Sequence, residues 1–191
     1  KFPELLRKHG VENSVLECVD TGKLINDCLN EVANDTPMHF QWYAELIDKT
    51  FGKVSATDPS ITSLIVKEPI GVVAGVVPWN FPLMMAVWKA APALAAGCSV
   101  IIKPAEDTPL SALKIAQIAK EAGIPDGVFN VLPGFGDVGE ALGRHNDVDA
   151  VSFTGSTEVG GLFMKYSGES NLKTIGLEMG GKSPFLVLED A

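Results

Sequence analysis

The sequence predicts an α/β protein with a doubly wound, mainly parallel sheet that carries helices on both faces. After Pro69, apolar runs of strand length alternate regularly with stretches of helical pattern. The runs 71–77 and 99–102 are apolar on both faces, as expected of strands that helices cover from both sides. Repeated strand–helix units of this length are typical of parallel sheets. The predicted elements are strands 70–77, 99–103, 128–132, 149–153 and 173–178, alternating with helices 82–96, 108–122, 137–143 and 156–166.

Helix 108–122 is the element whose ends are marked most clearly. Thr108 is predicted to cap its N-terminus, and Pro109 stands in its first turn. Gly123 is predicted to end the helix, and Pro125 prevents its continuation.

The first 50 residues are predicted to be helical and amphipathic. Trp42, Leu46 and Ile47 occur at helical spacing. The polar residues 34–36 followed by Pro37 are typical of a place where a helix begins.

Between this helical part and the regular pattern lies a segment of different composition. Residues 51–60 contain glycine, proline and small polar residues, which predict a loop. Residues 61–66 are predicted to form a strand that ends before Pro69.

The composition argues against several classes of function. The net charge of −9 disfavours a nucleic-acid groove, which needs clustered Lys and Arg, and equally an anionic membrane surface. Residues 83–102 are almost entirely apolar, but Lys89 and Pro92 interrupt them, so we expect a buried helix and a buried strand there instead of a membrane span. The first residues lack the apolar stretch of a signal peptide. The three cysteines and three histidines show no CxxC pair and no ligand spacing, which disfavours a disulfide framework or metal site and favours a reducing compartment such as the cytoplasm.

Parallel sheets of this kind bind ligands in the loops at the carboxyl ends of their strands, and these loops hold most of the unusual residues. Asn80 follows the first strand, between two prolines that fix the turn 78–82. Its amide could donate a hydrogen bond to a developing oxyanion. Alternatively, Asn80 is only the N-terminal cap of helix 82–96.

Two further loops carry groups suited to a nucleotide. Lys103 and Glu106 follow the second strand and suit a ribose diol, although they could equally be an exposed ion pair. Gly155 and Ser156 follow the fourth strand and open a helix whose free amides and dipole favour a pyrophosphate, although this could be an ordinary capped helix.

The segment 134–139 formally matches the GxGxxG dinucleotide fingerprint. It follows the third strand instead of the first, and 151–154 offers no acid where the fingerprint requires one. We therefore interpret these glycines as a close approach of the backbone to a ligand and not as the main pyrophosphate site.

Glu178 leaves an apolar strand and enters the glycine pair Gly180–Gly181. A carboxylate in that place is predicted to be poorly solvated, which would raise its pKa toward the range of a general base. The alternative is a strand-end glutamate that points to solvent.

Four motifs, taken together and in this order, resemble the aldehyde dehydrogenase superfamily. They are PWNFP (78–82), KPAE (103–106), FTGSTEVG (153–160) and LEMGGKSP (177–184). The resemblance extends from about residue 15 to 191 and implies a Rossmann-like fold that binds NAD or NADP. Residues 16–23 also resemble the family, although Cys18 and Val19 depart from its usual residues.

The resemblance implies a role for each matching position. Asn80 would be the oxyanion donor, Glu178 the general base for thioester hydrolysis, and Lys89 a support for Asn80 or a proton relay. Glu106 at the ribose position favours NAD over NADP, because a 2′-phosphate would meet a carboxylate. The implied cofactor-binding residues are Val77, Pro78, Trp79, Asn80, Lys103, Ala105, Glu106, Gly136, Gly139, Phe153, Thr154, Gly155, Ser156, Val159, Met179 and Gly180.

The resemblance also implies four parts of the chain. These are an N-terminal helical part of the cofactor domain (1–50), an arm that joins subunits into dimers or tetramers (51–69), a dinucleotide-binding domain (70–180) and the start of a catalytic domain (181–191). The substrate would be a small-molecule aldehyde, with Met84, Met85 and Trp88 in the pocket wall.

The family's nucleophilic cysteine lies beyond the LEMGGK motif, and none of Cys18, Cys28 and Cys98 can replace it. We therefore expect the chain to be part of a longer enzyme and to be inactive alone. The alternatives are a non-catalytic nucleotide-binding module and a semialdehyde or acyl-phosphate reductase on the same scaffold. Asn80 and Glu178 argue against the module, and Glu178 favours the hydrolytic enzyme over the reductase.

Overall fold

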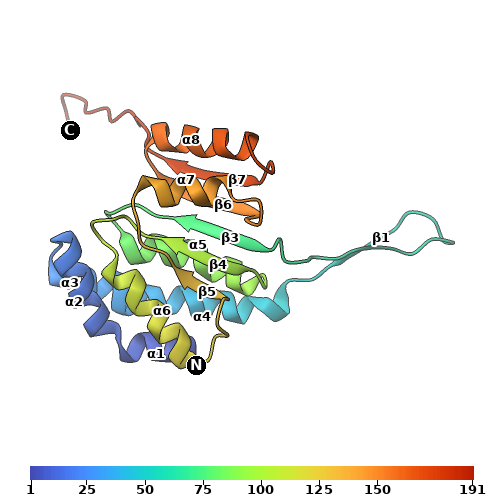
Figure 1. Ribbon diagram of the computed structural model, residues 1–191, viewed down its shortest axis with the longest axis horizontal. Helices are drawn as coiled ribbons and strands as arrows, with labels where there is room; N and C mark the ends of the chain where they lie inside the picture. Colours follow the sequence, from blue (N-terminus) through green and yellow to red (C-terminus); the bar gives the residue numbers. More distant parts are fainter.

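The computed structural model describes residues 1–191 and contains a five-stranded sheet in the order β5-β4-β3-β6-β7 (Figure 1). Every neighbouring pair is parallel, which confirms the predicted fold class. The predicted strands are present with slightly shifted ends. They are β3 (Val72–Val76), β4 (Ser99–Lys103), β5 (Phe129–Val131), β6 (Ala150–Gly155) and β7 (Thr174–Met179).

The strand order places a topological switch at the centre of the sheet. The chain runs outward from β3 through β4 to β5, then returns to form β6 on the other side of β3. The connections that leave β3 and β6 therefore diverge to opposite faces of the sheet, which opens a crevice at their carboxyl ends.

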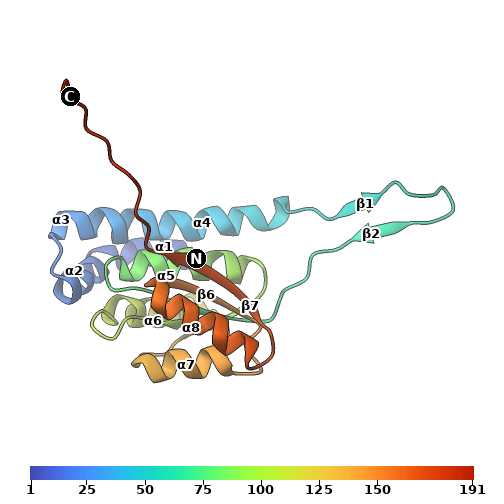
Figure 2. The same cartoon turned by 90° about the horizontal axis from the view of Figure 1, so that it is seen from above.

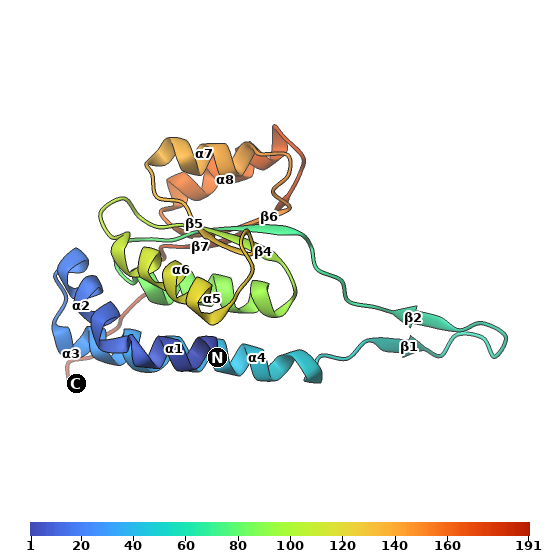
Figure 3. The ribbon, with the colours of Figure 1, turned by 60° about the horizontal axis from the view of Figure 1, so that its bottom comes forward.

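Helices cover both faces of the sheet (Figure 3). On one face lie α5 (Pro82–Ala95) and α6 (Leu110–Ala122), which enclose a core of fifteen buried residues, here called the larger core. On the other face lie α7 (Gly136–Arg144) and α8 (Thr157–Gly168), which enclose a core of seven, the smaller core. The apolar segment 83–102 is thus the buried helix α5 and the buried strand β4, as predicted, and no helix is long and apolar enough to cross a membrane.

The N-terminal helices form a further layer outside α5 and α6 (Figure 3). They are α1 (Phe2–Lys8), α2 (Gly10–Thr21), α3 (Ile25–Cys28), the π-helical segment η1 (Leu29–Asp35), α4 (Thr36–Leu46) and the 3₁₀ turn η2 (Ile47–Lys49).

The predicted helix start at residues 34–37 is confirmed in part: α4 begins at Thr36 with Pro37 in its first turn, but no side chain caps it. Asp35 already has helical torsions, and α4 continues η1 without a break. The proline is accommodated because its missing N–H falls where the wider π-helical turn already interrupts the regular i→i−4 ladder.

The spacing of Trp42, Leu46 and Ile47 does not mark the packed face of α4. Trp42 and Ile47 are exposed, whereas Phe40 is buried. The Phe40 ring packs against Phe2 of α1 with ring centroids 4.7 Å apart. The packed face of α4 is therefore rotated away from the one that the apolar spacing indicated.

Residues 51–69 contain a two-stranded antiparallel hairpin that protrudes from the body of the molecule (Figure 2). Its strands are β1 (Lys53–Ser55) and β2 (Ser63–Ile65). The predicted strand 61–66 contains β2, but the predicted loop 51–60 contains β1. Strand β1 has no apolar alternation of its own, because it pairs only with β2 and buries neither face.

The predicted cap of α6 is wrong at its N-terminus and correct at its C-terminus. Thr108 makes no capping bond, and its buried hydroxyl has no partner within the chain. The amide of Leu110 instead donates to Asp20 of α2, with N and Oδ2 2.8 Å apart. Gly123 ends the helix in the left-handed conformation with φ of 90°, as predicted.

Candidate active site and cofactor pocket

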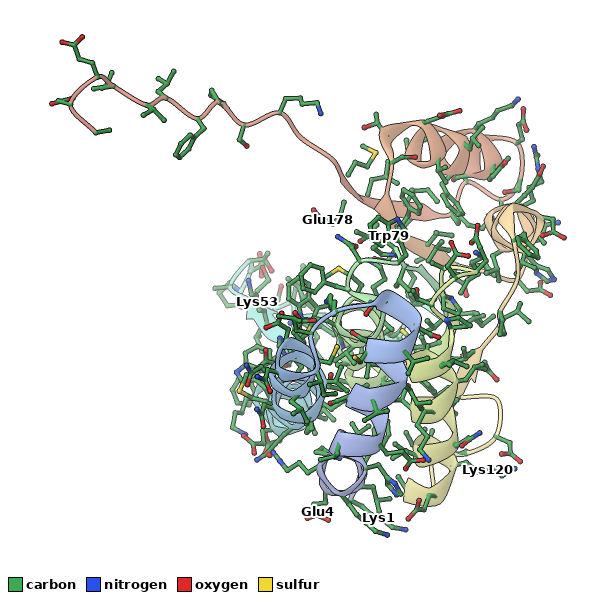
Figure 4. All side chains as sticks on the ribbon, turned by 90° about the vertical axis from the view of Figure 1, so that its left-hand side faces the viewer. Lys1, Glu4, Lys53, Trp79, Lys120 and Glu178 are labelled. Carbon is green, nitrogen blue, oxygen red and sulfur yellow. The ribbon has the colours of Figure 1, made fainter.

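A cleft of about 840 Å³ opens at the switch point between the ends of β3 and β6. It contains Asn80, Lys89 and Glu178, the three residues predicted to act in catalysis, from three different elements. Figure 4 shows Glu178 and Trp79 at the same end of the sheet. The lining residues are Pro78, Trp79, Asn80, Met85, Trp88, Lys89, Ser152, Thr154, Gly155, Ser156, Glu178, Met179 and Gly180.

Asn80 does not cap the helix that follows it. The capping position of α5 is Phe81, and no side chain from this turn bonds to the helix amides. The amide of Leu83 donates instead to Glu17 of α2, with N and Oε2 3.1 Å apart. The alternative of a simple cap is therefore wrong, and the exposed Asn80 side chain lines the cleft.

Lys89 reaches the cleft from α5 with its side chain buried. Its ammonium donates to Thr154 Oγ1 at 2.8 Å and Ser152 Oγ at 3.3 Å. Burial lowers the pKa of Lys89, and the negative charge of Glu178 opposes this effect. The hydrogen bonds of Lys89 thus go to β6, and its ammonium lies in the field of the Glu178 carboxylate.

Glu178 lies on β7, directly beside Thr154 of β6 in the sheet register. Its side chain is exposed, so the predicted poor solvation is wrong for this chain. The reason is that β7 is an edge strand and no element of the chain packs over its end. The carboxylate nevertheless lines the cleft that contains Asn80 and Lys89.

A second pocket, of about 460 Å³, lies beside the cleft, under α7 and α8. The two cavities share Pro78, Trp79, Thr154, Gly155 and Ser156, so that one elongated ligand could occupy both. Asn80, Met179 and Gly180 line the cleft. All the other residues predicted to bind cofactor line this pocket, namely Val77, Pro78, Trp79, Lys103, Ala105, Glu106, Gly136, Gly139, Phe153, Thr154, Gly155, Ser156 and Val159.

Lys103 and Glu106 form an ion pair at the mouth of this pocket, with Nζ and Oε2 3.3 Å apart. The alternative of an exposed ion pair describes only Glu106, since the side chain of Lys103 is 7% exposed. A hydrogen bond from its own backbone N–H, followed by the bond from Lys103, lowers the pKa of Glu106. The pair therefore presents a buried donor and an ionised acceptor side by side.

The N-terminus of α8 meets the same pocket at Gly155 and Ser156. Ser156 caps the helix, since its Oγ accepts from the amide of Val159 at 3.2 Å. A Cβ atom at Gly155 would lie 2.6 Å from the ring of Phe153, so only glycine fits there. The helix is thus an ordinary capped helix whose N-terminus also faces the pocket, and the two interpretations are compatible.

The whole chain, residues 1–191, matches the aldehyde dehydrogenase family. The chain belongs to the aldehyde dehydrogenase family. This confirms the resemblance that the four loop motifs indicated.

Individual relatives agree with this assignment. The chain is 52% identical to an aminoacetaldehyde dehydrogenase of Pseudomonas aeruginosa and 51% identical to the NADP/NAD-dependent aldehyde dehydrogenase PuuC of Escherichia coli. Each match covers 100% of this chain but only 38% and 39% of the relatives. The NAD+ complex structure of an aldehyde dehydrogenase from Bacillus cereus superimposes with a TM-score of 0.94 at 42% identity, over 98% of this chain and 38% of that one. The chain therefore spans somewhat more than a third of the length of its relatives.

Within this aldehyde dehydrogenase chain, several lining residues were not predicted. Ser152 is one, although its spacing of two from Thr154 on β6 places both side chains on one face. Of the predicted wall residues, Met85 and Trp88 line the cleft, whereas Met84 is buried. The other residues that were missed line the second pocket: Val76, Glu140, Leu162, Phe163 and Tyr166.

None of the three cysteines lines the cleft or the second pocket. Cys28 and Cys98 are buried, and burial raises the pKa of the Cys28 thiol to about 11. Cys18 is half-buried and donates to the carbonyl of Lys23. The structure also brings together no group of three or more His, Cys, Asp or Glu side chains that could hold a metal ion.

Proposed function

We propose that this chain is the cofactor-binding part of an NAD(P)+-dependent aldehyde dehydrogenase that oxidises an aldehyde to the carboxylic acid through a cysteine thioester. The observation that carries the proposal is the meeting of Asn80, Lys89 and Glu178 in one cleft that joins the cofactor pocket. An amide donor and a carboxylate that line one cavity suit acyl transfer followed by hydrolysis.

The residues of the second pocket fit a dinucleotide. Lys103 and Glu106 offer a donor and an acceptor to a ribose diol. The N-terminus of α8 favours an anion, and Gly155 lets the backbone approach it. When bound, the cofactor supplies the hydride acceptor. Glu106 favours NAD+ over NADP+, because its ionised carboxylate would repel a 2′-phosphate.

The chain's own residues then act on the acyl group. Asn80 donates its side-chain amide to the oxygen that becomes negative when the thiolate adds to the aldehyde and again when water attacks the thioester. Glu178 accepts the proton of the attacking water. Lys89, held by Thr154 and Ser152, keeps a positive charge near the Glu178 carboxylate.

Since no cysteine of the chain reaches the cleft, we expect residues 1–191 alone to bind NAD(P)+ without oxidising aldehydes. The arm 51–69 is proposed to join subunits into dimers or tetramers of the full-length enzyme. It protrudes from the body and exposes apolar side chains such as Val54 and Leu64.

Glu178→Gln in the full-length enzyme tests the function. The variant should still release about one equivalent of NADH per site in the first turnover, because hydride transfer precedes hydrolysis. Steady turnover should fall by about 10²–10⁴-fold, the usual contribution of a general base. Stopped-flow absorbance of NADH separates the two phases.

Asn80→Ala is the matched control, because it should weaken the burst itself. A Glu178→Gln enzyme with unchanged steady turnover would contradict the hydrolytic assignment. Turnover restored by phosphate or by a thiol acceptor would favour the reductase, and a wild-type enzyme that binds NAD+ but oxidises no aldehyde would favour the nucleotide-binding module.

A further inference from the structure

Helix α2 presents two carboxylates, one turn apart, to the N-termini of two other helices. Glu17 Oε2 accepts from the amide of Leu83 at the start of α5, at 3.1 Å. Asp20 Oδ2 accepts from the amide of Leu110 at the start of α6, at 2.8 Å. Neither α5 nor α6 has a side-chain cap of its own, so α2 satisfies an amide that each of these helices leaves free.

The two capped helices follow the two loops that line the site. Helix α5 begins directly after the Asn80 loop, residues 78–81, which lines the cleft. Helix α6 begins after the Glu106 loop, residues 104–109, which borders the cofactor pocket. A carboxylate at a helix N-terminus both accepts a hydrogen bond and interacts favourably with the helix dipole, so it fixes the start of the helix. Each carboxylate of α2 therefore fixes the downstream end of one loop.

The Asn80 loop has a second contact with the same part of the chain. The ammonium of Lys23, two residues after the end of α2, lies 3.7 Å from the centroid of the Phe81 ring. Lys23 is held in place by an ion pair with Glu31, with Nζ and Oε2 2.5 Å apart. The residue after Asn80 and the first turn of α5 are thus both fixed from α2.

Glu17 is buried to an extent that is unusual for a carboxylate. Its side chain has no exposed surface, and Ser111 of α6 faces it. Desolvation raises the pKa of Glu17, while the hydrogen bond from the Leu83 amide lowers it. An apolar side chain would fill the same space without this desolvation cost. What the carboxylate adds is its hydrogen bond to the start of α5.

We propose that Glu17, assisted by Lys23, is a positioning residue for the Asn80 loop, and that Asp20 is a positioning residue for the Glu106 loop. The consequence for catalysis rests on the proposed function, because it requires that Asn80 meets the reacting acyl group and that Glu106 meets the cofactor. The two carboxylates then affect different steps, although they lie on one helix.

Paired variants of the full-length enzyme test this division. Glu17→Met removes the acceptor at similar volume and should lower kcat about tenfold, with little change in the KM for NAD+, because a small displacement of a catalytic group is costly. Glu17→Gln keeps an acceptor oxygen for Leu83 and should restore most of the kcat. Asp20→Ala should raise the KM for NAD+ several-fold at nearly unchanged kcat, and Asp20→Asn should restore it.

Lys23→Met keeps the proposal testable if Glu17→Met does not fold. It removes the contact over the Phe81 ring and the ion pair with Glu31 but leaves Glu17 in place, and it should lower kcat about threefold, the value of a modest cation–π interaction. An unchanged kcat in Lys23→Met together with an unchanged KM for NAD+ in Asp20→Ala would overturn the proposal. Equal effects of the Glu17 and Asp20 variants on kcat and on KM would overturn the division of roles.

Amide hydrogen exchange in the 191-residue chain provides a readout that needs neither cofactor nor activity. The Leu83 amide should exchange faster only in Glu17→Met, and the Leu110 amide only in Asp20→Ala. Unchanged exchange at both amides would refute the positioning role even in an active enzyme. Conversely, selective exchange in a protein that neither binds NAD+ nor oxidises aldehydes would support the positioning role and refute the proposed function.

Discussion

The two faces of the sheet are built differently, although helices cover both. On the face of the larger core, α5 and α6 are themselves covered by α1, α2 and α4 (Figure 3). On the face of the smaller core, α7 and α8 are the outermost layer. The first face thus has two layers of helices and the second has one, and this difference determines which parts of the molecule could be inferred from local sequence.

The second layer of helices changes which faces of a helix are apolar and which residue caps its N-terminus. Helix α5 contacts the sheet on one side and α4 on the other, and it is apolar almost all round, which is why segment 83–102 looks like a membrane span. Its N-terminal amide is capped by Glu17, which is 66 residues away in the sequence. Helix α8 has an outer face in solvent and is capped by Ser156, the residue directly before it.

The largest expected effect compares one leucine from each core. Leu83 of the larger core has no exposed surface, and Leu142 of the smaller core is 6% exposed under a single layer of helix. We expect Leu83→Ala to lower the free energy of unfolding by about 4 kcal/mol and Leu142→Ala by about 2 kcal/mol, because the two-layered site can collapse less around the cavity. Denaturant unfolding, with equal m-values for the two variants, measures both free energies of unfolding. Equal losses in the two variants would contradict the expected difference between the two cores.

The strand–helix alternation and the gathering of the loop motifs at one edge of the sheet could be predicted, because both are properties of short segments. Apolar runs of strand length specify the parallel sheet, and a parallel sheet specifies that its carboxyl ends meet at one edge. Once that edge is fixed, Asn80, Glu106 and Glu178 must lie close together, and the structure places all three along the same pair of cavities.

The capping residues could not be predicted, because each of them joins distant segments. Thr108 has the residue type and position of a cap, yet Asp20 provides the hydrogen bond. Nothing in the local pattern around Glu17 shows that it will be buried against α5 and α6. Similarly, the exposure of Glu178 depends on β7 being an edge strand, which is a property of the whole sheet.

A smaller effect is expected where a cap is local. Ser156→Ala removes the acceptor for the Val159 amide and should lower the free energy of unfolding by about 1 kcal/mol. Ser156→Asn keeps an acceptor and serves as the control. Thermal or denaturant unfolding measures both variants, and the faster amide exchange should be confined to the first turn of α8. A loss of several kcal/mol would indicate that α8 depends on remote contacts as α5 does.

The smallest expected effect is a pH dependence on the face with one layer of helices. Lys173 is buried beside α7, and its ammonium donates to the carbonyl of Gly143 at 2.6 Å and to Ser170 Oγ at 2.9 Å. Both partners are neutral, and desolvation lowers the pKa of Lys173. Between this lowered pKa and the unfolded value of about 10.4, the folded state binds fewer protons than the unfolded state. The contribution of Lys173 to the free energy of unfolding therefore increases as pH rises through that interval.

Lys173→Met removes the titrating group and should remove this increase, while Lys182→Met, at an exposed lysine of the C-terminal segment, should leave it unchanged. Urea unfolding of the three proteins between about pH 8 and the unfolded pKa of about 10.4 gives the slopes directly. Identical slopes for wild type and Lys173→Met would mean that water reaches the ammonium through the single layer of helices. The two faces would then differ in solvation as well as in packing. Water would reach the buried Lys173 under the single layer, whereas Glu17 on the other face has no exposed surface.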